Sequence, residues 1–135
     1  MTVVLDTNVL ISALLHPSRE CGQIMEYVLA GHVTWLITPP ILAEYGEVCA
    51  RPELPLSAPA RQQLLHALRG LPILPLPPLT AAAPRCPDRD DQPFLTAACH
   101  YRADYLITGN TKHFPTTLAP PPHIVTPRAW LALVL

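Results

Sequence analysis

The stretch VVLDTNVLISA, residues 3–13, carries the pattern that decides the fold of this chain. A short apolar run rich in β-branched residues stops at Asp6, a small polar cluster follows, and a helix-like apolar pattern begins behind it. In an α/β protein this order places Asp6 at the carboxyl end of the first strand, where open parallel sheets bind their ligands. A second interpretation is that Asp6 caps the following helix, because Asp, Thr and Asn are favoured caps. The rest of the chain decides between them.

The composition indicates a globular protein of ordinary domain size. The chain has 135 residues, of which 50% are hydrophobic and 14% charged, so we expect a single domain over residues 1–135 with one substantial core. No apolar run reaches the ~18 residues of a membrane-spanning helix. No basic stretch or cleavage pattern typical of a signal peptide accompanies the first apolar run. These features predict a cytoplasmic protein that does not associate with membranes.

The cysteines and the charge balance restrict the function only slightly. The four cysteines are scattered without CxxC spacing, which argues against zinc ligation and, in a cytoplasmic protein, against disulfides. A net charge of −1 argues against broad nonspecific binding to phosphates. Most of the basic residues are arginines, whose planar guanidinium suits local phosphate contacts. The charge balance alone therefore neither supports nor excludes a nucleic acid partner.

Strand-like and helix-like patterns alternate along the chain, which predicts a parallel sheet with helices on both faces. Besides the N-terminal strand, we expect strands at residues 33–37, 73–74, 105–107 and 124–125. We expect helices at about 8–15, at 18–29 with Ser18 as the cap, at 38–49, at 57–70, at 91–102 and from 126 onward. The predicted fold class is therefore α/β, a three-layer α/β/α sandwich around a parallel sheet of four or five strands.

The acidic residues are few, and their positions indicate one site. Asp6 follows the first strand, Glu44 lies in the third expected helix, and Asp88, Asp90 and Asp91 lie where a loop meets the fifth. Parallel topology brings such segment ends to one rim of the sheet. Carboxylates gathered there repel one another unless a cation binds between them, and oxygen ligands suit Mg²⁺ or Mn²⁺. Such a site can activate water and neutralise charge on a phosphate, as phosphodiester hydrolysis requires.

Four stretches in this order resemble the motifs of the PIN-domain family, specifically the compact toxins of bacterial and archaeal toxin–antitoxin pairs. They are residues 4–13 (VLDTNVLISA), 41–48 (ILAEYGEV) with Arg51-Pro52, 88–95 (DRDDQPFL) and 103–110 (ADYLITGN). The resemblance implies a PIN-like fold and a Mg²⁺- or Mn²⁺-dependent endoribonuclease with Asp6, Glu44 and Asp91 as its catalytic, metal-binding acids. It also implies RNA as the substrate, a small antitoxin as the partner and a homodimer in isolation.

The last of these motifs departs from the fuller family pattern. Many relatives carry an aspartate directly after the Thr-Gly pair or just before the next phenylalanine, where this chain has Asn110 and His113. Asn110 can ligate or hydrogen-bond but brings no charge. The departure favours one well-held metal ion over two. It also leaves open a catalytically weak or inactive PIN module that acts by binding RNA or protein.

Several neighbouring residues have both a structural and a functional interpretation. Asn8 either bonds to Asp6 and orients it or caps its own helix, and Asp88 is either a helix cap or a metal ligand. Thr108 ends a buried strand at the rim, where it can bond a carboxylate or a phosphate. Asn110 is a supporting candidate for the reason given above. We interpret Asp104 as structural, and His113, although near the rim, as a surface residue.

A receiver-like regulatory domain is an alternative from another class, since it also places an acidic pocket at strand ends. That fold needs two adjacent acids after the first strand and a phosphorylatable aspartate at the end of a middle strand. The short strand expected at 73–74 is followed by proline, which makes this the weaker alternative.

Abundant leucine and proline predict that the native assembly covers some apolar surface. We expect the helix at 18–29 and the helix starting near Thr38 to contribute to it. Control by an antitoxin would then be steric, with a basic residue of the antitoxin against the acidic cluster.

Overall fold

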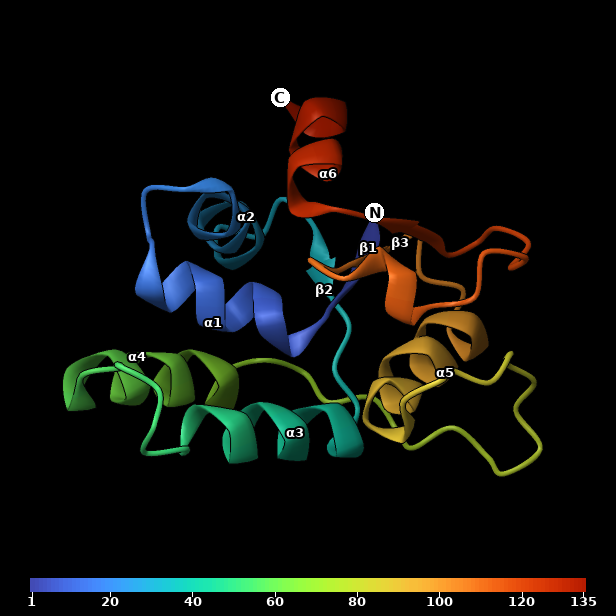
Figure 1. Ribbon diagram of the computed structural model, residues 1–135, viewed down its shortest axis with the longest axis horizontal. Coiled ribbons are helices and arrows are strands. Elements are labelled where there is room, and N and C mark those ends of the chain that lie inside the picture. Colours follow the sequence, from blue (N-terminus) through green and yellow to red (C-terminus); the bar gives the residue numbers. More distant parts are fainter.

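A four-stranded parallel sheet forms the centre of the computed structural model, which describes residues 1–135 (Figure 1). The strands are β1 (Thr2–Leu5), β2 (Thr34–Trp35), β3 (Tyr105–Ile107) and β4 (His123–Val125), and their order is β2-β1-β3-β4. Val4 pairs with Leu106, and Ile107 with Val125. The buried apolar residues of β1 explain its inner position, since an inner parallel strand is covered on both faces. The expected parallel sheet is thus confirmed, with four strands.

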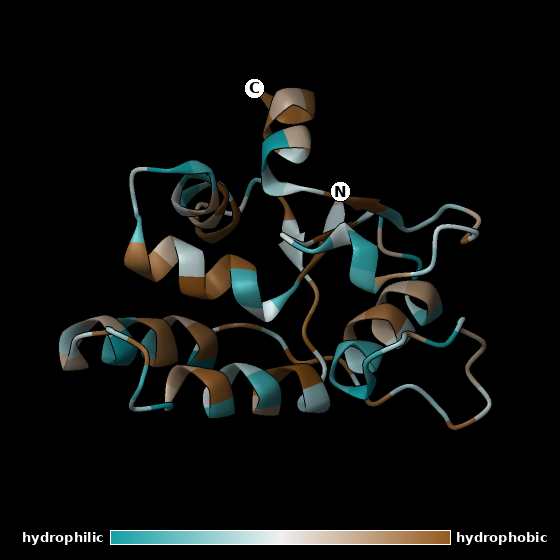
Figure 2. Ribbon diagram, in the orientation of Figure 1, coloured by the Kyte–Doolittle hydropathy of each residue, from teal (hydrophilic) through white to brown (hydrophobic).

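Six helices surround this sheet, together with two short 3₁₀ turns. The helices are α1 (Thr7–Leu15), α2 (Glu20–Leu29), α3 (Pro39–Cys49), α4 (Ala58–Arg69), α5 (Gln92–His100) and α6 (Pro127–Val134), and the turns are η1 (Arg89–Asp91) and η2 (Thr111–His113). In Figure 1, α1, α2 and α6 lie on one side of the strands and α5 lies on the other, with α3 and α4 below. The helices carry both brown and teal segments in Figure 2, as expected for helices that bury one face. This is the α/β/α arrangement that the alternating pattern predicts.

Most element boundaries follow local sequence signals. Ser57 and Thr126 cap α4 and α6, and each hydroxyl oxygen accepts a hydrogen bond from the backbone N–H three residues on, at 3.2 Å and 3.1 Å.

The four cysteines are free, and Cys49 and Cys86 are buried in the core. No helix is both long enough and apolar enough to cross a membrane.

The predicted cap at Ser18 is wrong, because α2 begins at Glu20 with Arg19 in the cap position. A close local contact accompanies this later start. The turn before α2 folds back on the helix so closely that a side chain at Gly22 would lie 1.8 Å from the Pro17 carbonyl oxygen. Leu29, the last residue of this helix, is 50% exposed.

The predicted strand at Ile73-Leu74 is also wrong. The Leu74 N–H donates one hydrogen bond to the Ile37 carbonyl, at 2.8 Å, but no ladder continues from it. Three of the next four residues are prolines, which have no N–H to donate to a neighbouring strand. The strand expected at 33–37 is shortened to β2. The helix expected at 91–102 is shortened to α5, with η1 before it.

A buried tyrosine joins α3 to the end of β1. The Tyr45 hydroxyl donates a hydrogen bond to the Leu5 carbonyl at 2.5 Å and accepts one from Trp35 Nε1 at 3.3 Å. Burial raises the pKa of Tyr45 far above its usual value, so the hydroxyl keeps its proton and remains a donor. Glu44 precedes this tyrosine and Asp6 follows Leu5, so the bond connects the segments that carry the two acids.

We expect Tyr45→Phe to destabilise the fold by about 1–3 kcal/mol, because it leaves the buried Leu5 carbonyl and the Trp35 N–H without partners. Urea unfolding followed by circular dichroism measures this difference. Tyr27→Phe is the matched control, since the Tyr27 hydroxyl makes no hydrogen bond and its loss should change stability by less than about 0.5 kcal/mol. Equal effects of the two substitutions would contradict this role of Tyr45.

Candidate functional site

Asp6 lies directly after β1, and its side chain is only 6% exposed. The Thr108 hydroxyl, directly after β3, donates a hydrogen bond to Asp6 Oδ2 at 2.7 Å, and Asn8 Nδ2 lies 3.4 Å from the same oxygen. Asn8 Oδ1 in turn accepts the Gly109 N–H at 3.1 Å. Although Asp6 occupies the cap position of α1, its side chain makes no capping bond. The site interpretation of Asp6 therefore accounts for its contacts better than the cap interpretation.

Asp91 ends η1 at the start of α5, and one of its carboxylate oxygens lacks a partner. Oδ2 is buried and accepts no hydrogen bond, and His113 Nδ1 lies 3.5 Å from it. Burial, followed by the negative charges of Asp6 and Asp88, raises the pKa of Asp91 to about 6. A buried carboxylate oxygen without a partner is unfavourable, and a bound cation would remove that penalty.

Glu44 completes the acidic group from α3. Burial raises the pKa of Glu44, and the negative charges of Glu47, Asp90 and Asp6 raise it further. Burial likewise raises the pKa of Asp6, against the hydrogen bond from Thr108. The negative charge of Asp6 therefore acts on both Glu44 and Asp91.

Asp6 lies near enough to Glu44 and to Asp91 to raise the pKa of each, but no three acidic, histidine or cysteine side chains are arranged to hold a metal ion. The residues nevertheless fit a divalent cation on two counts. The orphaned Asp91 oxygen is a buried ligand atom without a partner. The mutual repulsion that raises the carboxyl pKa values is relieved by a positive charge between them. Oxygen donors of this kind suit Mg²⁺ or Mn²⁺.

The supporting candidates and their neighbours differ in the contacts that they make. Asp88 Oδ1 accepts the Asp90 N–H at 2.9 Å and caps η1. The exposed Asn110 donates its backbone N–H to Thr108 Oγ1 at 3.0 Å, whereas its amide side chain makes no hydrogen bond. Asp104 is structural, as expected, because its Oδ2 accepts the Thr2 N–H at 2.7 Å. Thr108 and Asn8 contact Asp6 directly, whereas Asp88 and Asn110 do not.

His113 is a surface residue, as expected, with its side chain 51% exposed, but sequence reasoning did not predict its proximity to one of the acids. Its Nδ1 lies 3.5 Å from Asp91 Oδ2, and its positive charge, when protonated, lowers the pKa of both Asp91 and Asp6. The available signal was its position in the loop after β3, since the loops that follow the strands of a parallel sheet meet at the ligand-binding edge. The histidine itself has no spacing pattern that would single it out.

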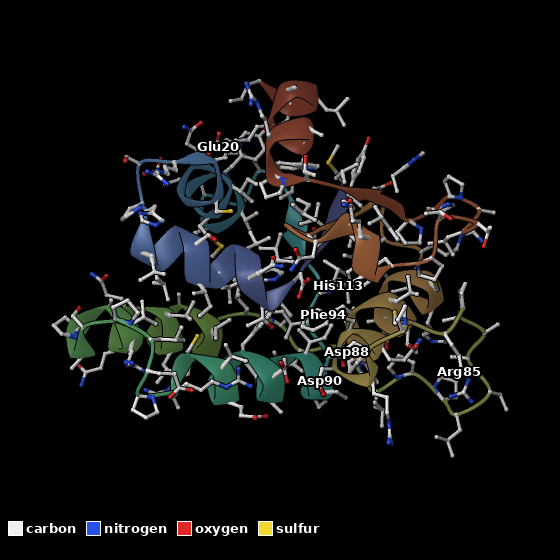
Figure 3. The ribbon with its side chains drawn as sticks, in the orientation of Figure 1. Glu20, Arg85, Asp88, Asp90, Phe94 and His113 are labelled. Atoms are coloured by element: carbon white, nitrogen blue, oxygen red, sulfur yellow. The ribbon has the colours of Figure 1, made fainter.

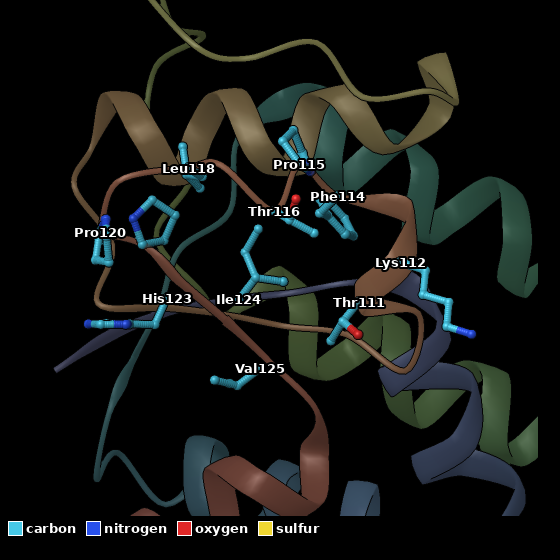
Figure 4. A pocket seen from close by; sticks show the side chains of 11 residues that line it. Thr111, Lys112, Phe114, Pro115, Thr116, Leu118, Pro120, His123, Ile124 and Val125 are labelled. Atoms are coloured by element: carbon cyan, nitrogen blue, oxygen red, sulfur yellow. The ribbon is translucent and has the colours of Figure 1, made fainter.

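An open groove of about 660 Å³ runs along this rim, lined by Pro87, Asp88, Arg89, Asp90, Lys112 and His113. Figure 3 shows Asp88, Asp90 and His113 near one another, where α3 meets α5. A second hollow of about 400 Å³ lies between the loop after η2 and β4 (Figure 4), and no acidic residue lines it. In the first groove two cations, Arg89 and Lys112, stand beside Asp88 and Asp90, whereas Asp6, Glu44 and Asp91 are not among its lining residues.

Comparison with known proteins identifies the family to which this chain belongs. Residues 2–112 match the model of the PIN domain. The chain belongs to the PIN-domain family. This membership confirms the family that the sequence motifs indicate, and it removes the receiver-like alternative.

Two relatives of this PIN domain are informative. It is 32% identical over 111 residues to the uncharacterized protein MJ1680 of Methanocaldococcus jannaschii, across 80% of this chain and 70% of that protein. Its fold is similar to a chain in the crystal structure of VapBC2 from Rickettsia felis bound to a DNA fragment from their promoter. That similarity has a TM-score of 0.60 at 17% identity and covers 93% of this chain and 97% of the other. The structural relative establishes the PIN-like fold.

We expect the free energy of unfolding of the metal-free PIN domain to fall as the pH rises from about 4 to about 6.5. Asp91 has a raised pKa, about 6 against 3.8, so between these values the folded state binds more protons than the unfolded state. The stabilisation from Asp91 is fully present below its unfolded pKa of 3.8, and it is lost as the pH rises past its folded pKa of about 6. Urea unfolding at several pH values in a chelator measures the effect. Asp91→Asn should flatten the profile, and an unchanged slope in that variant would contradict the assignment.

Proposed function

We propose that this PIN domain is a Mg²⁺- or Mn²⁺-dependent endoribonuclease of the cytoplasm and the toxin of a toxin–antitoxin pair. The observation that carries the proposal is the pair of buried carboxylates at one rim. Asp6 is held by Thr108, and Asp91 beside it has an oxygen without a partner. PIN domains are generally nucleases, so membership in the family supports the same chemistry.

Asp6, Glu44 and Asp91 would hold the cation. A bound Mg²⁺ or Mn²⁺ supplies a Lewis acid that activates water for attack on a phosphodiester and offsets charge on the phosphate. We propose direct hydrolysis without a covalent enzyme intermediate, because the water activated by the cation would be the nucleophile.

The remaining residues of the rim orient the acids and receive the substrate. Thr108 and Asn8 bond to Asp6 and fix the direction of its carboxylate. Arg89 and Lys112 line the groove, where their positive charges attract RNA phosphates despite the negative net charge of the chain. Asn110 brings no charge to this rim, which favours one cation over two.

A small antitoxin and a second copy of the chain are the partners that we propose. An apolar groove of about 420 Å³ lies between α1, α2 and α4, next to the exposed Leu29. The helix α2, which we expected to contribute, lines this groove, whereas α3 does not. The structural relative belongs to VapBC2, which was crystallised bound to promoter DNA, and this supports an antitoxin partner. A basic residue of the antitoxin at the rim would compete with the cation.

We expect Asp6→Asn to reduce cleavage of single-stranded RNA by about 100-fold or more, since it keeps the shape of the side chain and removes a ligand charge. A cleavage assay with purified protein and Mg²⁺ or Mn²⁺ measures the rate, and circular dichroism checks the fold. Glu53→Gln, at an exposed position away from the rim, is the control and should leave the rate unchanged. Full activity of Asp6→Asn, or undiminished cleavage in excess chelator, would contradict the proposal. RNA binding without metal-dependent cleavage by the unaltered protein would instead support the inactive-module alternative.

We expect the protein alone to form a homodimer, because apolar side chains such as Leu29 and Leu65 are exposed on its helices. Multi-angle light scattering on the purified chain should give twice the 14.8 kDa mass of one copy. A strictly monomeric mass at micromolar concentration would exclude the homodimer.

A further inference from the structure

We propose that a hollow between residues 76–85 and the starts of α3 and α5 binds a phosphate group of the RNA substrate, away from the phosphodiester that is cleaved. Thr38, Arg85 and Arg89, which line the hollow, would contact that phosphate. The inference rests on the proposed function in taking the substrate to be RNA. It concerns where the RNA binds and not how it is cleaved.

The charge of this hollow suits an anion. The hollow has a volume of about 450 Å³, and no acidic residue lines it. Its polar lining residues are Thr38, Arg85, Arg89, Gln92 and Thr96. A negatively charged ligand would therefore meet two positive charges here and none of the carboxylates that line the neighbouring groove.

Two helix N-termini meet at the hollow. Thr38 directly precedes α3 and Gln92 begins α5, and both residues line it. The two helices are in contact, and Figure 1 shows the start of α3 beside the start of α5. The helix dipole and the unsatisfied N–H groups give each N-terminus a partial positive charge, which favours phosphate groups.

The side chain of Thr38 is a second and independent indication of a ligand. Thr38 is 1% exposed and occupies the cap position of α3, but its hydroxyl makes no capping bond, unlike those of Ser57 and Thr126. The N–H three residues on, that of Ile41, donates to no backbone group either. Polar groups that are buried without a partner are unfavourable, and a phosphate oxygen in the hollow would accept a hydrogen bond from the Thr38 hydroxyl.

The side chain of Gln92 holds the loop that carries Arg85. Gln92 Oε1 accepts the Cys86 N–H at 2.8 Å, and Gln92 Nε2 donates to the Pro84 carbonyl at 3.0 Å. These bonds fix the backbone on both sides of Arg85 against α5. Neither Arg85 nor Arg89 has an ion-pair partner in the chain, so both guanidinium groups are available to phosphate oxygens.

Arg89 connects the hollow to the acidic groove, because it lines both. Figure 3 shows Arg85 to the right of Asp88 and Asp90, on the loop that leads to them. A single-stranded RNA that lies along the acidic groove can therefore continue past Arg89 to Arg85. This continuity favours RNA over other molecules that carry phosphate.

The hollow also has room and surface for more than a phosphate ion. Glu44 lies about 9 Å along α3 from Thr38, at the rise of about 1.5 Å per residue of a helix, which is longer than one phosphate group. Leu76 and Leu79 line the hollow and are exposed, so they offer apolar surface on which a nucleobase can pack. The occupant is therefore a nucleotide that flanks the cleaved bond.

The test measures RNA binding while excess chelator prevents cleavage. Single-stranded RNA of about 12 nucleotides, random in sequence and without terminal phosphates, carries a fluorescein label, and fluorescence anisotropy gives the Kd. We expect Arg85→Gln to weaken binding by about 10-fold and to lower the slope of log Kd against log salt concentration by about 0.7, as for one lost phosphate contact. Thr38→Val should weaken binding by about 5-fold with an unchanged slope, since it removes a hydroxyl and no charge. Arg128→Gln, at an exposed position of α6 on the far side of the molecule in Figure 1, should change neither.

The outcomes separate this inference from the proposed function. Equal affinities of the unaltered protein, Arg85→Gln and Thr38→Val would overturn the phosphate site, and so would an equal loss in Arg128→Gln or no RNA binding by the unaltered protein at micromolar concentration. Displacement of the RNA by millimolar inorganic phosphate at constant ionic strength would show a site for the free ion and also overturn it. Metal-dependent cleavage would survive each of these results. The expected losses in a protein that cleaves no RNA would instead overturn the nuclease and support the phosphate site. Circular dichroism establishes that the variants fold, as expected because Arg85 is exposed and Thr38 makes no capping bond.

Discussion

The burial of one carboxylate, that of Asp6, is the constraint on which the rest of the structure depends. It sits at the end of the central strand β1, where a charged group is unfavourable unless other groups compensate for the water that it loses. Thr108, 102 positions away in the sequence, supplies the strongest contact. The hydrogen bond from Tyr45 to the neighbouring Leu5 carbonyl fixes α3 beside the same strand end. The sheet, the helix and the loop after β3 are therefore arranged around one acidic side chain, and a divalent cation is the partner that would complete it.

Much of this arrangement could be predicted from local sequence. The apolar run before Asp6 predicts an inner parallel strand, and residues 105–107 form a strand with the predicted bounds. Ser57 and Thr126 cap their helices because the hydroxyl and the N–H that it bonds are only three residues apart. A capping signal that spans three residues does not depend on the rest of the chain. The contact of Asn8 with Asp6 is short-range in the same sense.

The differences from the prediction have separate causes. Near the start of α2, Gly22 fits closely against Pro17, which a capping pattern does not contain. The segment at 73–74 has strand-like residues, but the prolines after it cannot extend a ladder. His113 meets Asp91 only because the loop after β3 and the turn before α5 come to the same rim, and the two are 22 positions apart without a recurring pattern. Family motifs drew attention to the acids, but they assigned no role to this histidine.

The central claim is that Asp6 and Asp91 hold one divalent cation. The most direct measurement is a crystal structure of the protein grown with Mn²⁺, with anomalous diffraction data collected to locate the ion. The account predicts one anomalous peak at the rim within about 2.0–2.6 Å of a carboxylate oxygen of each residue. An ordered rim without such a peak, or Mn²⁺ bound only elsewhere on the protein, would contradict it.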